Sequence, residues 1–129
     1  MDIRLDGQVA IVTGAGRGLG RSHALALAAR GARVVVNDLG DNEVVKEIEA
    51  NGGSALANRA DVSDWSEVQA MVRQVMEAWG RVHILVNNAG ILRDKSFLKM
   101  SMDDFRRVVD VHLMGSANCS KAVWEIMRE

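Results

Sequence analysis

Short apolar runs alternate with longer amphipathic stretches along the 129-residue chain. The apolar runs are rich in β-branched residues and close at glycine or polar residues, which is typical of buried strands. We expect four strands, in residues 8–14, 32–38, 54–62 and 81–90, and the third has the weakest pattern. Because these runs are apolar throughout, both faces of the sheet should be covered. The pattern predicts an α/β fold built on a parallel sheet.

Each predicted strand is followed by a stretch in which apolar residues recur at helical spacing. We expect helices in 21–30, 42–53 and 64–80, and a last helix from Met102 almost to the end. Ser101 and Asp104 form a pattern similar to a capping box at the start of this last helix. The methionines are interpreted as packing residues, among them Met71, Met76, Met100, Met102, Met114 and Met127.

A glycine-rich segment, TGAGRGLG, lies between the first predicted strand and its helix. Glycines there allow the backbone to approach a diphosphate, and the helix N-terminus offers free N–H groups to it. Asp38 ends the second strand, 18 residues after Gly20, where a carboxylate can bind an adenosine ribose. The combination predicts a dinucleotide site that favours NAD, because Asp38 repels the 2′-phosphate of NADP. Arg17 could pair with that phosphate, or it could be a solvated loop charge.

Composition and charge narrow the class of protein. The net charge is −1 and the sequence pI about 6.3, so neither nucleic acid nor an anionic membrane is expected as a partner. The single cysteine, Cys119, excludes an internal disulfide and is expected to be a packed thiol. Neither a secretory signal nor a membrane-spanning run is recognised, and no metal-ligand spacing is present. These features predict a cytoplasmic protein without a metal site.

Three motifs together resemble the short-chain dehydrogenase/reductase (SDR) family. They are the Thr-Gly-x-x-x-Gly-x-Gly spacing from Thr13 to Gly20, ADV at 60–62 and NNAG at 87–90, in family order. The resemblance covers the whole chain and implies a Rossmann-type, doubly wound parallel sheet that begins in the strand order 3-2-1-4. It also implies that Asp61 and Val62 border the adenine and that the backbone of 88–90 lies along the cofactor. The candidate cofactor-binding residues are Gly14, Arg17, Gly18, Leu19, Gly20, Asp38, Asp61, Val62, Asn88, Ala89 and Gly90.

A narrower likeness is to (3R)-hydroxyacyl-CoA dehydrogenase-type members of the family. It rests on VVVNDLG, NNAGILRDKSF and VHLMGS, and it implies a 3-hydroxyacyl or 3-oxoacyl thioester as substrate. A generic ketoacyl or alcohol substrate is the alternative. His112 stands where many members of the family have an asparagine that helps to relay protons. Histidine can shuttle protons near neutrality, but a lone histidine on a mostly apolar helix favours a structural role.

The family's catalytic serine, tyrosine and lysine cannot be assigned to this sequence. The chain contains no tyrosine, and neither Ser116, Ser120 nor Lys121 has the expected position. No catalytic residue is therefore predicted. Residues 1–129 are interpreted as a single NAD(P)-binding domain, incomplete at its C-terminus, from a longer reductase that forms homo-oligomers. A non-catalytic module that binds NAD or pairs with another chain is the alternative.

Overall fold

The computed structural model of the chain describes residues 2–40 and 43–129. Its sheet has the order β3-β2-β1-β4, and every neighbouring pair is parallel. The strands are β1 (Val9–Thr13), β2 (Arg33–Asn37), β3 (Ser54–Asn58) and β4 (Ile84–Val86). In the register, Ile11 lies beside Val35 on one side and Leu85 on the other. The parallel sheet and its 3-2-1-4 order are confirmed.

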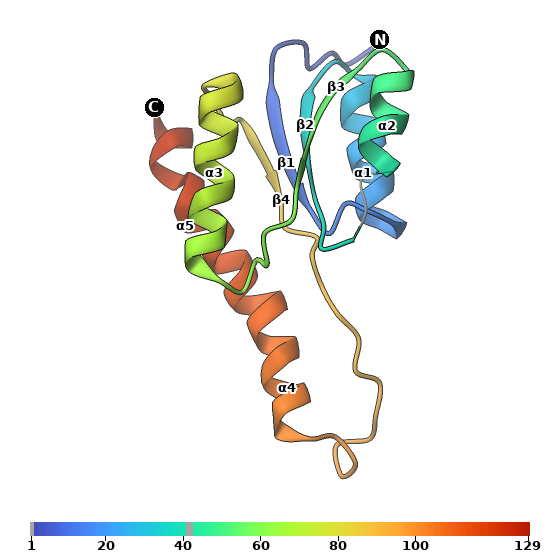
Figure 1. The fold of residues 1–129 in the computed structure, drawn as a ribbon, viewed down its shortest axis with the longest axis vertical. Coiled ribbons are helices and arrows are strands. Elements are labelled where there is room, and N and C mark those ends of the chain that lie inside the picture. The colour runs from blue at the N-terminus through green and yellow to red at the C-terminus, as the bar shows by residue number, and fades with distance from the viewer. Residues whose placement is uncertain (1, 41–42) are drawn as a thin grey trace.

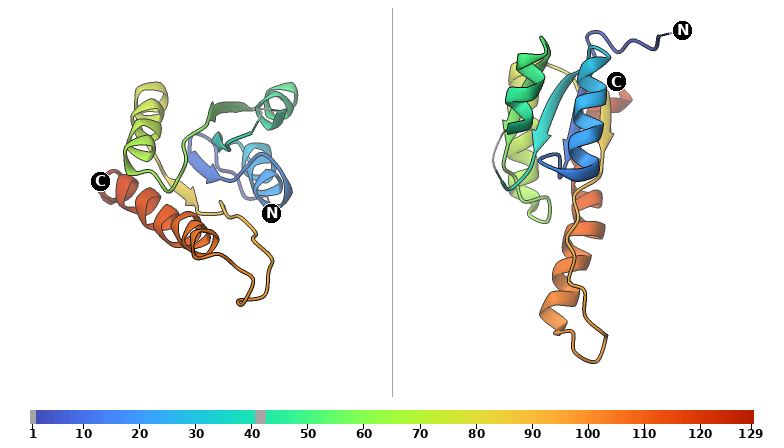
Figure 2. Two further views of the ribbon diagram at one scale, coloured as in Figure 1. Left: turned by 60° about the horizontal axis from the view of Figure 1, so that its bottom comes forward. Right: turned by 90° about the vertical axis from the view of Figure 1, so that its right-hand side faces the viewer.

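Helices cover both faces of the sheet (Figures 1 and 2). Helices α1 (Gly18–Ala29) and α2 (Glu43–Ala50) lie on one face, and α3 (Trp65–Trp79) and α5 (Gly115–Arg128) on the other. Side chains alternate along a strand, so Val12 joins the core beneath α1 and α2 while Ile11 joins the core beneath α3 and α5. Burying such a side chain contributes about 1.5–3 kcal/mol. This explains why the strand sequences are apolar throughout.

Capping residues mark the ends of two of the helices, and one of these caps, at Ser101, was expected from the sequence. The Asp64 side chain caps α3 by accepting a hydrogen bond from the Glu67 N–H, and α3 ends at Gly80, whose φ is 72°. Helix α4 (Met102–Val109) begins after Ser101, whose hydroxyl accepts from the Asp104 N–H at 3.1 Å. A left-handed glycine and a capping hydroxyl are favourable at these positions.

Several predicted boundaries were wrong. The third strand ends at Asn58 and the fourth covers only Ile84–Val86, so 59–62 and 87–90 lie in connections beyond the strand ends. The first helix begins at Gly18 instead of 21, because the glycine-rich segment itself supplies the first turn. The second helix is observed from Glu43 to Ala50, and Asn42, its predicted first residue, lies outside the described residues.

The last helix is not one regular α-helix. A π-helical segment, Asp110–Met114, separates α4 from α5, and the Gly115 N–H donates to the Asp110 carbonyl five residues earlier. Such segments occur often at functional sites. Helix α4 and the connection before it project beyond the sheet (Figure 1). Met102, Met114 and Met127 are about half exposed, and their interpretation as packing residues was wrong. Met71 of α3 is buried as expected.

Candidate functional site

A cavity of about 590 Å³ lies at the carboxyl ends of the strands, where β1 separates the two halves of the sheet. Parallel α/β sheets bind ligands at this kind of edge. Its walls come from the glycine-rich turn, the end of β2, residues 60–62, the connection after β4, and the helix that starts at Met102. Ten of the eleven predicted cofactor-binding residues line it: Gly14, Arg17, Gly18, Leu19, Asp38, Asp61, Val62, Asn88, Ala89 and Gly90. That they bind a cofactor stays a prediction.

The eleventh residue, Gly20, lies behind the wall. A Cβ at Gly20 would lie 2.8 Å from the Gly14 carbonyl carbon and closer still to its oxygen. Gly14 has a φ of 62°, and a Cβ there would lie 2.8 Å from Ala89 Cα. These two glycines allow the turn, α1 and the connection after β4 to touch through their backbones. The turn thus delivers the N-terminus of α1, which has no acidic residue in its first turn, to the cavity.

A buried hydroxyl joins the turn to the connection after β4. Thr13 is 1% exposed, and its Oγ1 accepts hydrogen bonds from the Asn88 N–H at 3.0 Å and the Ala89 N–H at 2.9 Å. The Asn88 side-chain amide donates in turn to the Gly14 carbonyl at 3.1 Å. The end of β1 therefore fixes two parts of the cavity wall, the glycine-rich turn and the connection after β4.

Asp38 extends from the end of β2 toward the glycine-rich turn. Its carboxylate accepts from the Gly16 N–H and from the Gly40 N–H, both at 2.9 Å. A Cβ at Gly16 would lie 2.7 Å from the Asp38 carboxyl carbon, so glycine at this position leaves room for the carboxylate. Arg17 is exposed, and among the described residues its side chain has no hydrogen-bond or ion-pair partner. The Asp38 carboxylate is therefore fixed in the cavity wall by hydrogen bonds, whereas the neighbouring Arg17 guanidinium is exposed.

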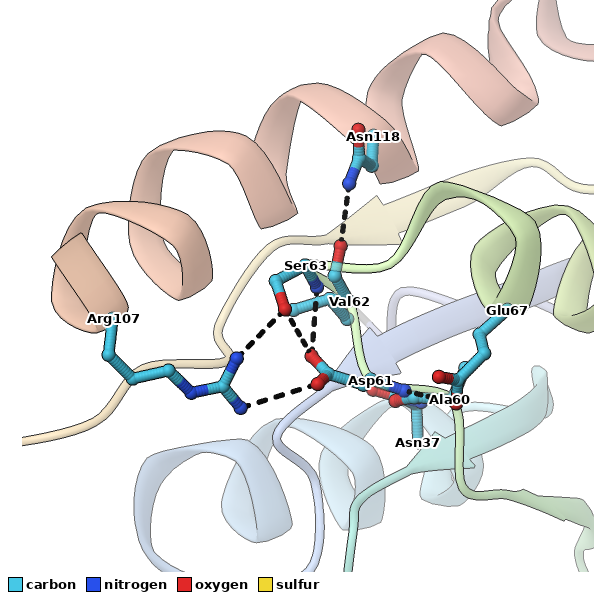
Figure 3. Close-up of polar contacts among 8 residues, drawn as sticks. All are labelled: Asn37, Ala60, Asp61, Val62, Ser63, Glu67, Arg107 and Asn118. Carbon is cyan, nitrogen blue, oxygen red and sulfur yellow. Dashed lines mark hydrogen bonds and ion pairs between the residues drawn. The ribbon is translucent and has the colours of Figure 1, made fainter. Parts of the chain in front are cut away.

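The 60–62 wall is held by polar side chains (Figure 3). Asp61 accepts from the Ser63 N–H and hydroxyl and from the Arg107 guanidinium at 3.3 Å. Burial raises the pKa of Asp61, but the Ser63 hydrogen bonds and the Arg107 charge outweigh it, so the pKa lies below its usual value. Asp61 is therefore ionised at neutral pH.

Two residues of this wall, Asn37 and Arg107, were not predicted from the sequence. Asn37 is a buried amide at the end of β2 that donates to the Ala60 carbonyl at 3.0 Å. A polar residue in an otherwise apolar strand was an available signal for it. For Arg107 the sequence offered no such signal, because the adjacent Arg106 has the same side chain and nothing in the sequence distinguishes the two.

His112 lies on the π-helical segment and lines the cavity. Its Nε2 lies 3.0 Å from the Ile91 nitrogen and 3.0 Å from the Ile91 carbonyl oxygen, so it accepts from the N–H in one tautomer and donates to the carbonyl in the other. A Cβ at Gly90 would lie 2.5 Å from the ring. These contacts fix the ring against the connection after β4, as the favoured structural role requires; nothing here tests the alternative, a role in proton relay.

The remaining nucleophiles have other partners. Ser116 donates to the His112 carbonyl at 2.7 Å, and Ser120 accepts from the Asn87 amide at 3.2 Å.

Within residues 2–40 and 43–129, no three His, Cys, Asp or Glu side chains form a group that could hold a metal ion. None of the described helices combines the length and apolar character needed to cross a membrane.

Cys119 is a buried residue of α5, and burial raises the pKa of its thiol to about 11. At pH 8 only about one thiol in a thousand is ionised, and the thiolate is the reactive form. We expect iodoacetamide to label Cys119 at least ~100-fold more slowly in the folded chain than in urea, measured by mass spectrometry. Equal rates in the two states would show that Cys119 is not a packed thiol.

Comparisons with known proteins agree with this geometry. The family model for short chain dehydrogenase matches residues 8–129. The peroxisomal multifunctional enzyme type 2 of Drosophila melanogaster is 48% identical over 139 residues, covering 98% of this chain and 23% of that enzyme. A 3-oxoacyl-[acyl-carrier-protein] reductase of Synechocystis is 46% identical over 127 residues, covering 95% of this chain and 51% of that one.

A solved structure gives the same result in three dimensions. The 7α-hydroxysteroid dehydrogenase complexed with NADH and 7-oxo glycochenodeoxycholic acid superposes with a TM-score of 0.91 at 41% identity. The match covers 98% of this chain and 50% of that protein. The chain thus spans about half the length of this protein and of the reductase, and less than a quarter of the multifunctional enzyme.

Proposed function

Because the chain belongs to the short chain dehydrogenase family, we propose that it forms the NAD-binding part of an oxidoreductase. The observation that carries the proposal is the pairing of the Gly14–Gly20 turn with the Asp38 carboxylate across one cavity. The diphosphate of the dinucleotide lies over the turn, at the N-terminus of α1. The adenosine ribose donates hydrogen bonds to Asp38, and the adenine lies against Asp61 and Val62.

NAD is preferred to NADP in this proposal. A 2′-phosphate would meet the Asp38 carboxylate, which two backbone N–H groups already hold toward the turn. Arg17 is the competing feature, because its free guanidinium could pair with that phosphate. Asp38 outweighs it, since its position is fixed by hydrogen bonds whereas Arg17 is exposed.

Asp38→Ala is expected to weaken NADH binding roughly 10-fold, because hydrogen bonds to a carboxylate are lost. NADPH binding is expected to stay equal or to tighten, so the preference for NADH narrows. Fluorescence titration with both cofactors measures the two dissociation constants. Glu49→Ala, which makes the same change of charge on the exposed side of α2, is the matched control. An unchanged preference in Asp38→Ala would refute the ribose contact.

The reaction of the parent enzyme is proposed as hydride transfer between nicotinamide and a hydroxyl or carbonyl carbon. When bound, the reduced cofactor would donate the hydride to a carbonyl carbon, or the oxidised cofactor would accept it from a hydroxyl-bearing carbon, while this chain's residues orient the dinucleotide. A 3-hydroxyacyl or 3-oxoacyl thioester is the proposed substrate, which the name of the Synechocystis relative, a 3-oxoacyl-[acyl-carrier-protein] reductase, supports. The test is oxidation of NADH by a 3-oxoacyl thioester, followed at 340 nm, in the parent protein.

A second candidate is a module that binds NAD without turnover. The absence of tyrosine from the chain favours it, because the family resemblance assigns the base to a tyrosine. Saturable NADH binding by the 129-residue chain, without NADH oxidation when a 3-oxoacyl thioester is added, would support this candidate. Oxidation by the chain alone would contradict it.

Assembly and location are further parts of the proposal. A homo-oligomer of the parent is supported by exposed apolar side chains on the helices after β4, such as Phe105, Leu113 and Trp124. Sedimentation velocity of the parent protein tests this assembly, and a monomer at micromolar concentration would contradict it.

The cytoplasmic location stays a prediction from the sequence, and the Drosophila relative is named as a peroxisomal enzyme.

A further inference from the structure

Residues 60–63, which the proposed function places beside the adenine, are held from the helices after β4. The Asn118 amide of α5 donates to the Val62 carbonyl at 2.9 Å, and Gly115 passes so close that a Cβ would lie 2.6 Å from Val62 Cγ2. Arg107 of α4 reaches the Ser63 hydroxyl of the same segment (Figure 3). The wall of the cavity therefore depends on residues more than forty positions later in the sequence.

Arg107 closes a three-residue network. One guanidinium nitrogen donates to Ser63 Oγ at 2.9 Å and the other to Asp61 Oδ2 at 3.3 Å. Ser63 Oγ donates to Asp61 Oδ1 at 2.7 Å. A planar guanidinium holds both acceptors in one geometry, which a lysine cannot do. The network therefore fixes the rotation of the Asp61 carboxylate as well as its charge.

The Asp61 carboxylate has one acceptor position left. A carboxylate offers about four lone-pair sites. Oδ1 accepts from the Ser63 N–H and hydroxyl, and Oδ2 accepts from Arg107. Asp61 lines the cavity, so the remaining site on Oδ2 is available to a donor on a bound molecule. Of the groups on an adenine ring, the 6-amino group is a donor that fits this site.

We propose that Arg107 is a positioning residue that aims the Asp61 carboxylate at the cofactor's base and thereby sets the preference for adenine over a base without a 6-amino group. This inference rests on the proposed function, because it requires a dinucleotide in the cavity. Arg107 acts through Asp61 and does not contact the reacting atoms.

The chain provides a matched comparison at the preceding position. Arg106 has the same side chain, is 70% exposed and pairs with Asp103 on its own helix. Arg107 is 37% exposed and pairs across the cavity wall with Asp61. Substitution at 106 removes an arginine from α4 without touching the network.

The test uses the full 129-residue chain with NADH and with reduced nicotinamide hypoxanthine dinucleotide, which has an oxygen in place of the 6-amino group. We expect the unmodified chain to prefer NADH about 10-fold, the effect of one hydrogen bond to a carboxylate. Arg107→Met is expected to reduce this preference to about 2-fold, because Oδ2 of Asp61 then has no partner and the carboxylate is held only through Oδ1, by Ser63. Arg106→Met is expected to keep it, and Arg107→Lys to give an intermediate value.

The ratio of the two dissociation constants separates the outcomes. Equal weakening of both cofactors by Arg107→Met would mean that Arg107 only supports the wall, and would overturn the inference. A selective loss of NADPH binding would make Arg107 a phosphate ligand and would overturn it too. If circular dichroism shows that Arg107→Met is unfolded, Ser63→Ala is used instead, because it removes one of the two acceptors of Arg107. We expect Ser63→Ala to lower the preference for NADH over the hypoxanthine dinucleotide. Binding of neither dinucleotide by the unmodified chain would refute the proposed function itself.

Discussion

Gly20→Ala is expected to weaken NADH binding on the order of 100-fold and to destabilise the chain by about 3 kcal/mol. The added Cβ would lie 2.8 Å from the Gly14 carbonyl carbon and 2.5 Å from Asn88 Nδ2. The carbonyl group of Gly14 cannot move away from this Cβ without moving the turn, and the Asn88 side-chain amide holds that carbonyl in place. The helix N-terminus would then shift away from the diphosphate. Thermal unfolding and NADH fluorescence titration measure the two effects.

The control for Gly20→Ala is Ser22→Ala, an exposed position on the same helix. Its effect on both measurements is expected to be small, because alanine favours helix and Ser22 is exposed. A Gly20→Ala variant that unfolds and binds NADH like Ser22→Ala would contradict the close approach of α1 to the turn.

Thr13→Val is expected to lower the free energy of unfolding by about 2 kcal/mol. Valine keeps the shape of threonine but removes the buried acceptor of the Ala89 N–H at 2.9 Å. The Asn88 N–H retains the Val86 carbonyl at 3.0 Å, so one donor, not two, is left without a partner. Weaker NADH binding is also expected, because residues 88–90 lose their link to β1. Urea denaturation measures the stability.

Thr13→Ser separates the hydroxyl from the methyl group. It keeps the acceptor and loses one buried methyl, which costs about 1 kcal/mol. We expect NADH binding to be retained in Thr13→Ser and weakened in Thr13→Val. The opposite order of the two variants would show that the hydroxyl does not hold the connection after β4.

The parts of the fold that were predictable depend on local patterns. The strands are apolar throughout because both faces are covered, and this reads directly from runs such as VVVND. Parallel strands place their carboxyl ends at one edge, so the approach of Asp38 to the glycine-rich turn followed from the order of elements. The Gly16 N–H that holds Asp38 was within the quoted motif, but its contact requires the folded turn.

What was not predictable depends on long-range packing. The π-helical segment at Asp110–Met114 changes the phase of the last helix, so its apolar face cannot be read with a period of 3.6 residues. Arg106 and Arg107 are equivalent in sequence, and only the position of α4 beside Ser63 separates them. The same projection of α4 exposes Met102, which spacing alone assigns to a core.

A structure of the chain with NADH bound is the most direct test of the dinucleotide site. We predict the diphosphate over Gly14–Gly20 at the N-terminus of α1, with an adenosine ribose hydroxyl within about 3.2 Å of the Asp38 carboxylate. A dinucleotide bound elsewhere, or one whose ribose lies away from Asp38, would contradict it.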